Sequence, residues 1–395
     1  MTAVFAAALP KAFLTGCGLL LFIVCSSVFA IEALIGQRAI VFDHLTTEQG
    51  LSQNGVTAFV QDREGLIWIG TQEGLNRYDG YDFTNFYHRI DEPQSLSHDQ
   101  VWALLSDSAG RLWVGTDAGL DVFNPERQAF DEFPLGGNGD SVGPISVFSL
   151  TEGSNGDVWV GSDRGLIQIR SDGDVKWFLH DLMQPNTLGA GSVRALYFDN
   201  FNRLWVGTDV GGITVLDSQG QIQSRFLSDP LNPNSLSENA VRAIQSDSLG
   251  RIWIGTFTRG VSVFDERDNR WFQFQNRASD PTSINGDSVR SILRSQSGDL
   301  WVGTDGGLNL WQGAEEGFQR YRADLSNNKS LGDNFILSLF EDEGGVIWVG
   351  TFNGISKWNA TVEKFPVFKL QASLGGEFSS PSISSFAEDP RGNLW

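Results

Sequence analysis

The chain has 395 residues and is acidic, with 28 Lys and Arg against 48 Asp and Glu and a formal net charge of −20. Its hydrophobic content of 41% is that of a folded protein, which argues against intrinsic disorder. The excess of negative charge argues against nucleic acid or an anionic membrane surface as a partner of this chain, because phosphates are bound by Lys and Arg side chains.

The first thirty residues differ in composition from the rest of the chain. The segment FLTGCGLLLFIVCSSVFA, residues 13–30, is an apolar run that follows Lys11 and ends in small residues. It predicts a signal peptide over residues 1–30, cleaved after Ala30, with an uncleaved membrane anchor as the alternative. A lipoprotein site at Cys17 is disfavoured, because the longest apolar run follows that cysteine. Both cysteines, Cys17 and Cys25, lie in this segment, so a processed chain would have no disulfide and no thiolate ligand or nucleophile.

The stretch GRLWVGTDAGLDVF, residues 110–123, recurs through the rest of the chain. Its tryptophan returns every 45 to 48 residues, at Trp68, Trp113, Trp159, Trp205, Trp253, Trp301, Trp348 and Trp395. A period of this length indicates a solenoid or a propeller. Each unit contains short apolar or alternating runs that are separated by Gly, Asn and Asp, without helical periodicity. This pattern favours the all-β propeller.

The fifth unit shows the predicted organisation of one repeat. It contains four strand candidates, at residues 241–247, 251–257, 260–266 and 270–276, with turn residues between them. Four antiparallel strands make one propeller blade. Because a blade packs both of its faces against neighbouring blades, its inner strands are expected to be apolar on both sides.

Fixed positions within the repeat support the same fold. A glycine stands two residues after each of the first seven motif tryptophans, Thr or Ser follows it, and Ala or Ser stands ten residues before every tryptophan. Small residues suit the innermost strand, where the blades converge. We expect the indole to fill the widening gap further out, and the glycine to let neighbouring backbone approach that ring.

The number of units predicts the size of the ring. Seven complete units predict an all-β, seven-bladed β-propeller of four-stranded antiparallel blades over residues 31–370. The eighth unit stops at Trp395, before its Gly-Thr pair, so we expect residues 371–395 to begin an eighth repeat and a second, truncated propeller. The segment VFDHL, residues 41–45, resembles the outer strand of later units and is a candidate to close the ring by pairing with the seventh blade.

The repeat resembles that of the two-component regulator propellers, most closely in GLSQNGVTAFVQDREGLIWIGTQEGLNRYDGYDF, residues 50–83. The resemblance extends from about residue 40 to the end of the sequence. It implies a periplasmic ligand-sensing region that forms a homodimer and is followed by an immunoglobulin-like domain and a membrane span. The expected output is a histidine kinase or hybrid kinase in the bacterial inner membrane, with a diguanylate cyclase as the alternative. Neither output motif lies in this sequence, so no catalytic residue is assigned.

One variable position of the repeat predicts a ligand site. Eleven residues before the motif tryptophans stand Thr57, Trp102, Phe148, Arg194, Arg242, Arg290 and Leu337. Arginine binds carboxylate or phosphate through two parallel hydrogen bonds, and aromatic faces stack on sugar rings. The expected ligand is therefore a small anion or saccharide. The alternative is that each arginine pairs with an acid such as Glu238 or Asp287, and that Trp102 and Phe148 belong to the core.

A second variable position follows each tryptophan by four residues. Its residues are Gln72, Asp117, Asp163, Asp209, Phe257, Asp305 and Phe352. We expect each aspartate to cap its own turn by accepting from the backbone two residues on, in preference to forming a ring of metal ligands. Phe257, Arg259, Phe352 and Asn353 interrupt the pattern and are further candidates for ligand contact.

No motif indicates a cofactor, a metal or a catalytic centre. The four histidines have no spacing typical of a zinc site or a catalytic triad, and the glycines mark blade turns rather than a phosphate-binding loop. Two other functions stay open at this point. One is a secreted propeller lyase of the streptogramin type, which shares a Gly-x-x-Trp repeat, and the other is a scaffold that binds protein.

Overall fold

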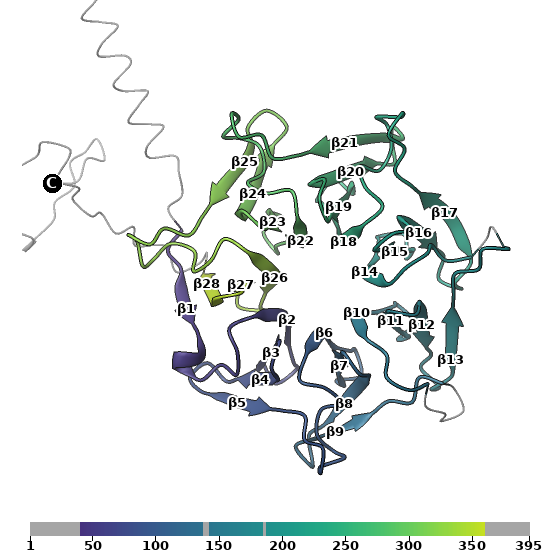
Figure 1. The fold of residues 1–395 in the computed structure, drawn as a ribbon, viewed down its shortest axis with the longest axis vertical. Helices are drawn as coiled ribbons and strands as arrows, with labels where there is room; N and C mark the ends of the chain where they lie inside the picture. The colour runs from purple at the N-terminus through teal and green to yellow at the C-terminus, as the bar shows by residue number, and fades with distance from the viewer. Residues whose placement is uncertain (1–39, 137–141, 185–186, 360–395) are drawn as a thin grey trace, which may run out of the picture. The chain divides into compact units, whose positions relative to one another are not determined.

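The computed structural model describes residues 40–136, 142–184 and 187–359, which form 28 strands and one short 3₁₀ turn, η1 (Thr47–Gln49). The strands make seven antiparallel sheets of four strands each, and the sheets stand around a common axis (Figure 1). The predicted seven-bladed β-propeller is confirmed. We number the blades 1 to 7 in chain order.

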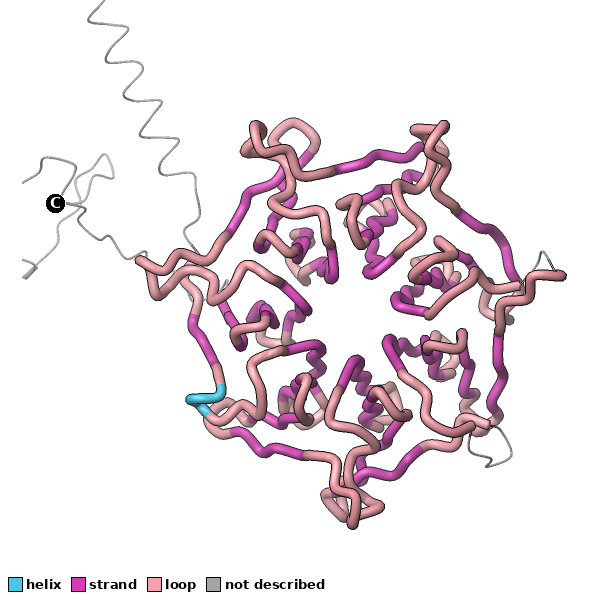
Figure 2. Tube along the Cα trace, viewed as in Figure 1, coloured by secondary structure: helices cyan, strands magenta, loops and turns pink. Residues whose placement is uncertain are grey.

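Each blade runs from the axis to the rim (Figure 2). The innermost strands are β2 (Val56–Gln61), β6 (Val101–Ser106), β10 (Val147–Glu152), β14 (Val193–Phe198), β18 (Val241–Ser246), β22 (Val289–Arg294) and β26 (Ile336–Glu341). The second strands are β3 (Ile67–Thr71), β7 (Leu112–Thr116), β11 (Val158–Ser162), β15 (Leu204–Thr208), β19 (Ile252–Thr256), β23 (Leu300–Thr304) and β27 (Val346–Thr351). The third strands are β4 (Leu75–Tyr78), β8 (Leu120–Asn124), β12 (Leu166–Ile169), β16 (Ile213–Leu216), β20 (Val261–Asp265), β24 (Gly307–Gly313) and β28 (Gly354–Asn359). The outer strands are β5 (Phe83–Phe86), β9 (Ala129–Glu132), β13 (Val175–Phe178), β17 (Ile222–Phe226), β21 (Arg270–Phe274), β25 (Gly317–Tyr321) and, for blade 7, β1 (Asp43–Leu45).

The motif tryptophans fill the spaces between blades, as expected. In the seven complete units they are 0–3% exposed. Trp205 packs within a cluster that joins Ile213 of blade 4 to Val241 and Phe264 of blade 5, and the ring of Phe226 stacks on it at 5.6 Å with an interplanar angle of 3°. Each blade therefore covers its apolar face only by packing against the next blade.

An aspartate six residues before the tryptophan anchors the indole in five blades. Asp199 Oδ2 accepts a hydrogen bond from Trp205 Nε1 at 2.9 Å, and its Oδ1 accepts from the backbone N–H of Arg203 at 2.9 Å. The same indole bond links Trp68 to Asp62, Trp113 to Asp107, Trp253 to Asp247 and Trp348 to Asp342. One carboxylate thus fixes the turn between the first two strands and satisfies a buried donor. The sequence analysis missed this role, although the spacing is visible in the repeat.

The motif glycines serve a different neighbour from the one we expected. A Cβ at Gly207 would lie 2.5 Å from Cγ1 of Val241, the first residue of the next blade's innermost strand. A Cβ at Gly255 would likewise lie 2.6 Å from Cγ1 of Val289. The glycine therefore makes room near the axis for a side chain of the adjacent blade. At Gly115, Gly161 and Gly350 a Cβ would also lie 2.7–3.0 Å from a backbone carbonyl oxygen of that blade.

The first described strand closes the ring. β1 pairs antiparallel with β28, with His44 opposite Ser356. The adjoining Phe42 is 1% exposed, and its N–H donates to the carbonyl of Lys329 at 2.9 Å. The predicted closure of blade 7 by residues 41–45 is confirmed, so the last blade contains one strand from the start of the ring and three from its end.

Some sequence-based predictions lie outside the described residues. They are the signal peptide at residues 1–30 with both cysteines, and the eighth repeat at residues 371–395. The domain boundaries at residues 31 and 370 stay predictions as well. Among the residues described, no helix is long and apolar enough to cross a membrane.

Candidate ligand-binding site

Three adjacent blades each place an arginine at the second position of the innermost strand. Arg194, Arg242 and Arg290 stand on β14, β18 and β22, which face the axis of the ring (Figure 1). Each arginine lies at a register shift, for example between Val241 and Ala243. A bulge of this kind releases a residue from the regular ladder and re-aims its side chain. We call Arg194, Arg242 and Arg290 the arginine arc.

Each guanidinium of the arginine arc lies over an aromatic ring. The distance from the guanidinium carbon to the ring centre is 3.5 Å for Arg194 over Phe148, a residue of the preceding blade. It is 4.8 Å for Arg242 over Phe257. These contacts are cation–π interactions, and they hold the side chains without neutralising their charge.

The third arginine, Arg290, packs against an aromatic ring that was not predicted from the sequence. The guanidinium carbon of Arg290 lies 5.1 Å from the centre of the Phe335 ring. Phe335 in turn contacts the predicted residue Phe352, with ring centres 4.9 Å apart. Phe335 directly precedes the strand β26, and no regular feature of the repeat distinguishes it.

Neither Glu238 nor Asp287 forms the ion pair with an arginine of the arc that the alternative interpretation suggests. Glu238 accepts instead from the N–H and hydroxyl of Thr258, at 2.7 and 2.9 Å, and Asp287 accepts from the N–H of Asn276 at 2.7 Å. In the described ranges, the one carboxylate oxygen within 4 Å of the arc is Asp209 Oδ2, 3.9 Å from Arg194 Nε. The Nε atoms of all three arginines are buried without a hydrogen-bond partner among the described residues.

Burial and mutual repulsion act on the arc. Burial, followed by the charge of Arg242, lowers the pKa of Arg194 below its usual range, and the same two causes lower the pKa of Arg290. Nearby carboxylates oppose the shift, namely Asp209, Asp117 and Asp163 for Arg194 and Asp305 for Arg290. Since the charge of Arg242 acts on both Arg194 and Arg290, Arg242 lies between two like charges.

The two predicted aromatic residues lie at the edge of the arc. Trp102 and Phe148 occupy the same bulged position on β6 and β10, and their ring centres are 5.8 Å apart with an interplanar angle of 67°. Trp102 Nε1 donates to Asp117 Oδ1 at 3.1 Å. Both side chains are half-buried.

The other predicted contact residues are exposed on the loops after the second strands. Phe257 and Phe352 are 40% and 43% exposed. Asn353 is exposed, and its Nδ2 donates to the carbonyl of Gly332 at 3.3 Å. Arg259 is exposed as well, and within the described residues its guanidinium makes no ion pair or hydrogen bond with the arc or any other group. The structure thus brings Phe257 and Phe352 to the arc but not Arg259.

The aspartates after the tryptophans do not cap their own turns. Asp209 Oδ1 accepts from the N–H of Ser192, at 2.9 Å, in the segment that leads into β14. The preceding threonine caps the turn instead: Thr116 Oγ1 accepts from the N–H groups of Ala118 and Gly119 at 3.2 and 3.1 Å. Our expectation for these aspartates was therefore wrong. The described part of the chain also contains no group of three His, Cys, Asp or Glu residues that could hold a metal ion.

In six blades, a buried polar side chain of the third strand accepts a hydrogen bond from a backbone N–H of the segment that leads into the same blade. The acceptor–donor pairs are Asn76 with Ser52, Asp121 with Ser97, Thr214 with Gly189, Ser262 with Ser237, Asn309 with Asn285, and Ser356 with Gly332. Among these six acceptors, Asp121 is the ionisable one. Burial raises the pKa of Asp121 to about 6, although hydrogen bonds from Ser97 act in the opposite direction.

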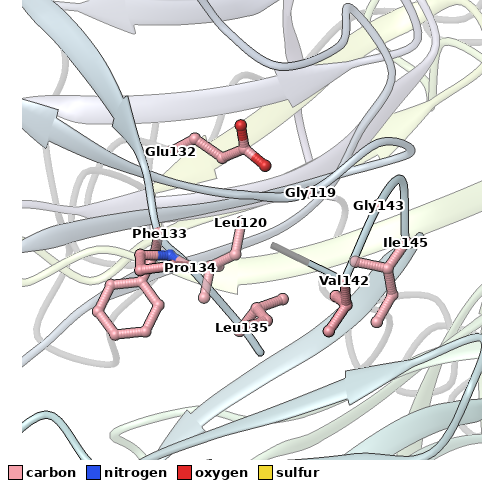
Figure 3. A pocket seen from close by; sticks show the side chains of 9 residues that line it. All are labelled: Gly119, Leu120, Glu132, Phe133, Pro134, Leu135, Val142, Gly143 and Ile145. Carbon is pink, nitrogen blue, oxygen red and sulfur yellow. The ribbon is translucent and has the colours of Figure 1, made fainter. Parts of the chain in front are cut away.

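Two surface hollows lie away from the arc. One is lined by Leu120 and Ile145, with the Glu132 carboxylate at its edge (Figure 3). The other lies around Phe274 and Trp311 on the rim of blades 5 and 6. Neither hollow contains a residue predicted from the sequence.

The repeats match a known family model. The model of the two component regulator propeller matches residues 50–73, 95–118, 187–210, 235–258, 283–306 and 330–353. A curated relative, "Histidine kinase P4" of Formosa agariphila, is 38% identical over 61 residues, which are 15% of this chain and 4% of the kinase.

Solved structures with the same fold include extracellular domains. The extracellular domain of a B. thetaiotaomicron protein assigned as a hybrid two component system is 25% identical, with a TM-score of 0.71 over 90% of this chain and 46% of that domain. That of a protein assigned as a one component system from the same organism is 25% identical, with a TM-score of 0.66 over 80% of this chain and 40% of that domain. The chain thus spans less than half of either domain. A streptogramin B lyase, at 15% identity, a TM-score of 0.58 and coverage of 81% and 97%, shares the fold alone. The chain therefore contains six two component regulator propeller repeats.

Proposed function

We propose that this chain is the periplasmic ligand-sensing region of a membrane-bound signal-transduction protein, whose output is a sensor histidine kinase of the hybrid type. The observation that carries the proposal is the likeness to the extracellular domain of a protein assigned as a hybrid two component system, over 90% of this chain. The match to a curated histidine kinase adds support, although it covers 15% of the chain.

The fold suits a receptor rather than a catalyst. The loops after the second strands and the segments that lead into the innermost strands share one face, because backbone hydrogen bonds join them in successive blades, such as Asp209 to Ser192 and Phe257 to Ala240. Variable residues on a fixed scaffold are the usual location of ligand recognition. A small-molecule ligand that binds one arrangement of a homodimer better than another would shift the equilibrium between them by its differential affinity.

The test uses the full-length protein in membranes. Membranes are incubated with radiolabelled ATP, with and without extracts of the medium in which the protein is expressed, and acid-labile phosphoryl label on the protein is measured. We expect inducer-dependent label that is lost when residues 40–359 are deleted. Formation of cyclic di-GMP instead would replace the kinase with the cyclase, and the absence of both activities would refute the sensor.

A further inference from the structure

We propose that the arginine arc, Arg194, Arg242 and Arg290, is an oxyanion-binding site, and that it takes a ligand carrying a carboxylate, sulfate or phosphate group on a body with an apolar face. The site deepens the sensing proposal, and its role in signalling rests on that proposal. Its capacity to bind an anion follows from the contacts of the arginines themselves.

The first support is that, in the described residues, Arg242 and Arg290 have no acidic partner within 4 Å, and Arg194 has a single distant one, Asp209 at 3.9 Å. The chain carries a net charge of −20, yet the Nε–H groups of these three arginines are buried and donate to no acceptor among the described residues. The two acids proposed from the sequence as partners, Glu238 and Asp287, are bound to other groups. A buried donor that lacks an acceptor is unfavourable unless a bound molecule supplies one.

The second support is preorganisation. Each arginine stands at a bulge of the innermost strand, and each guanidinium lies over an aromatic ring. An aromatic face restricts the rotation of the guanidinium but leaves its N–H groups, which lie in the guanidinium plane, free to donate. Side chains held in this way lose little conformational entropy when they bind an anion.

The third support is the division of the ring into a cationic part and an apolar part. The arginines belong to blades 4, 5 and 6, whereas the same strand position carries Trp102 and Phe148 in blades 2 and 3 and Leu337 in blade 7. In blade 1 it carries Thr57, whose hydroxyl donates to the carbonyl of Gly70. Phe335 and Phe352 extend the apolar part beside Arg290. A ligand that fills both parts needs an anionic group on one side and an apolar or ring face on the other.

The fourth support is the arrangement of the charges within the arc. Arg194 and Arg290 both experience the positive charge of Arg242. An anion next to Arg242 would neutralise the repulsion with both neighbours. We therefore expect Arg242 to contribute most to binding.

Binding is measured on the full chain by calorimetry, with sodium sulfate, inorganic phosphate, glucuronate and benzoate as probes and glucose as the neutral control, all at matched ionic strength. We expect at least one anionic probe to bind, and a ring-bearing anion to bind more tightly than inorganic sulfate. R242A should lower the affinity at least tenfold, and R242K should lower it less. R63A is the matched control, because Arg63 is an exposed arginine in the turn between β2 and β3 that does not contact the arc, and it should leave the affinity unchanged.

The outcomes separate the site from the sensing proposal. Absence of anion binding by the wild-type chain, or an equal loss in R242A and R63A, would refute the site. Near-ultraviolet circular dichroism shows whether R242A is folded. If it is misfolded, the anion affinities of R242K and R290K are compared with that of the control variant instead, and an equal loss would refute the site. If inducer-dependent phosphorylation survives in R242A, the arc is not the sensing site, but the proposal that the protein is a sensor kinase still stands. Anion binding in a protein without kinase or cyclase activity would support the site and refute the sensor.

Discussion

The guanidinium carbon of Arg194 lies 3.5 Å from the centre of the Phe148 ring, although the two residues belong to different blades. This contact shows how the propeller builds one site from positions that are about 46 residues apart in sequence. Each repeat supplies one side chain, and the stacking of blades brings these side chains together.

Replacing the stacked ring should weaken anion binding. F148L keeps an apolar side chain but removes the π face, whose interaction with a cation contributes about 0.5–2 kcal/mol. We expect the affinity for the tightest-binding anionic probe to fall by about 2- to 30-fold, measured by calorimetry. F201L is the matched control, because Arg203 lies over Phe201 but is paired with Asp199 and Glu266. An equal loss in F201L would contradict the role of Phe148.

Removing an indole anchor should destabilise the ring. D199A leaves the buried Nε1 of Trp205 without an acceptor and breaks the ion pair with Arg203. The expected loss in the free energy of unfolding is about 1–3 kcal/mol, measured by urea denaturation. D268A changes an exposed aspartate and should alter stability by less than about 0.5 kcal/mol. Equal effects in the two variants would show that the indole bond is not stabilising.

A methyl group at a motif glycine should force adjacent blades apart. In G207A the new Cβ would lie 2.5 Å from Cγ1 of Val241. Overpacking of this kind costs about 1–3 kcal/mol, which thermal unfolding would show as a lower Tm. In G119A the nearest atoms lie 3.6 Å from the new Cβ, so this variant should retain the wild-type Tm. A wild-type Tm for G207A would contradict the close approach.

The closure of the ring depends on the segment before β1. Phe42 is 1% exposed, and its neighbour Val41 is 46% exposed. F42A should therefore cost about 3–5 kcal/mol of unfolding free energy, whereas V41A should cost less than about 0.5 kcal/mol. Limited proteolysis should cleave F42A first near residues 40–46. If the two variants are equally stable, the closing strand does not hold the ring.

The buried carboxyl of Asp121 should make stability depend on pH. Burial raises the pKa of Asp121 to about 6, above the ordinary value of about 4 for an unfolded chain. The folded state therefore binds the proton more tightly, and this residue's contribution to stability is greatest below about pH 4 and falls as the pH rises to about 6. The difference corresponds to about 3 kcal/mol.

D121N tests this dependence, because Asn76 and Asn309 occupy the equivalent position in blades 1 and 6. We expect D121N to be more stable than the wild type at pH 7 and equally stable near pH 4, measured by urea denaturation at each pH. A constant difference between pH 4 and pH 7 would show that Asp121 does not titrate in this range.

Much of the fold could be predicted from the sequence. The predicted strands of the fifth unit at residues 241–247 and 251–257 correspond to β18 (Val241–Ser246) and β19 (Ile252–Thr256), because the alternation and the turn residues are local signals. The closing role of residues 41–45 was also visible, since that segment resembles an outer strand. The roles of the glycine and of the repeated aspartates were not, because each depends on which neighbour lies opposite.

The residues of the candidate site could be chosen from the sequence, but the contacts that these residues make could not. The positions of Arg194, Arg242 and Arg290 follow from the repeat, whereas the acids that pair with them depend on the fold, which leaves Glu238 and Asp287 bound elsewhere and Asp209 3.9 Å from Arg194. Phe335 could not be found by position, because it lies before its strand and is distinguished only by its contact with Arg290.

By itself the sequence determined the repeat, the number of blades and the positions that vary among them, because a blade is a local unit with a fixed pattern of small, aromatic and turn residues. Only the tertiary structure decided which side chains of different blades meet, and whether each charge finds a partner. Those outcomes depend on distances between residues of separate repeats, and stacking around the axis sets these distances.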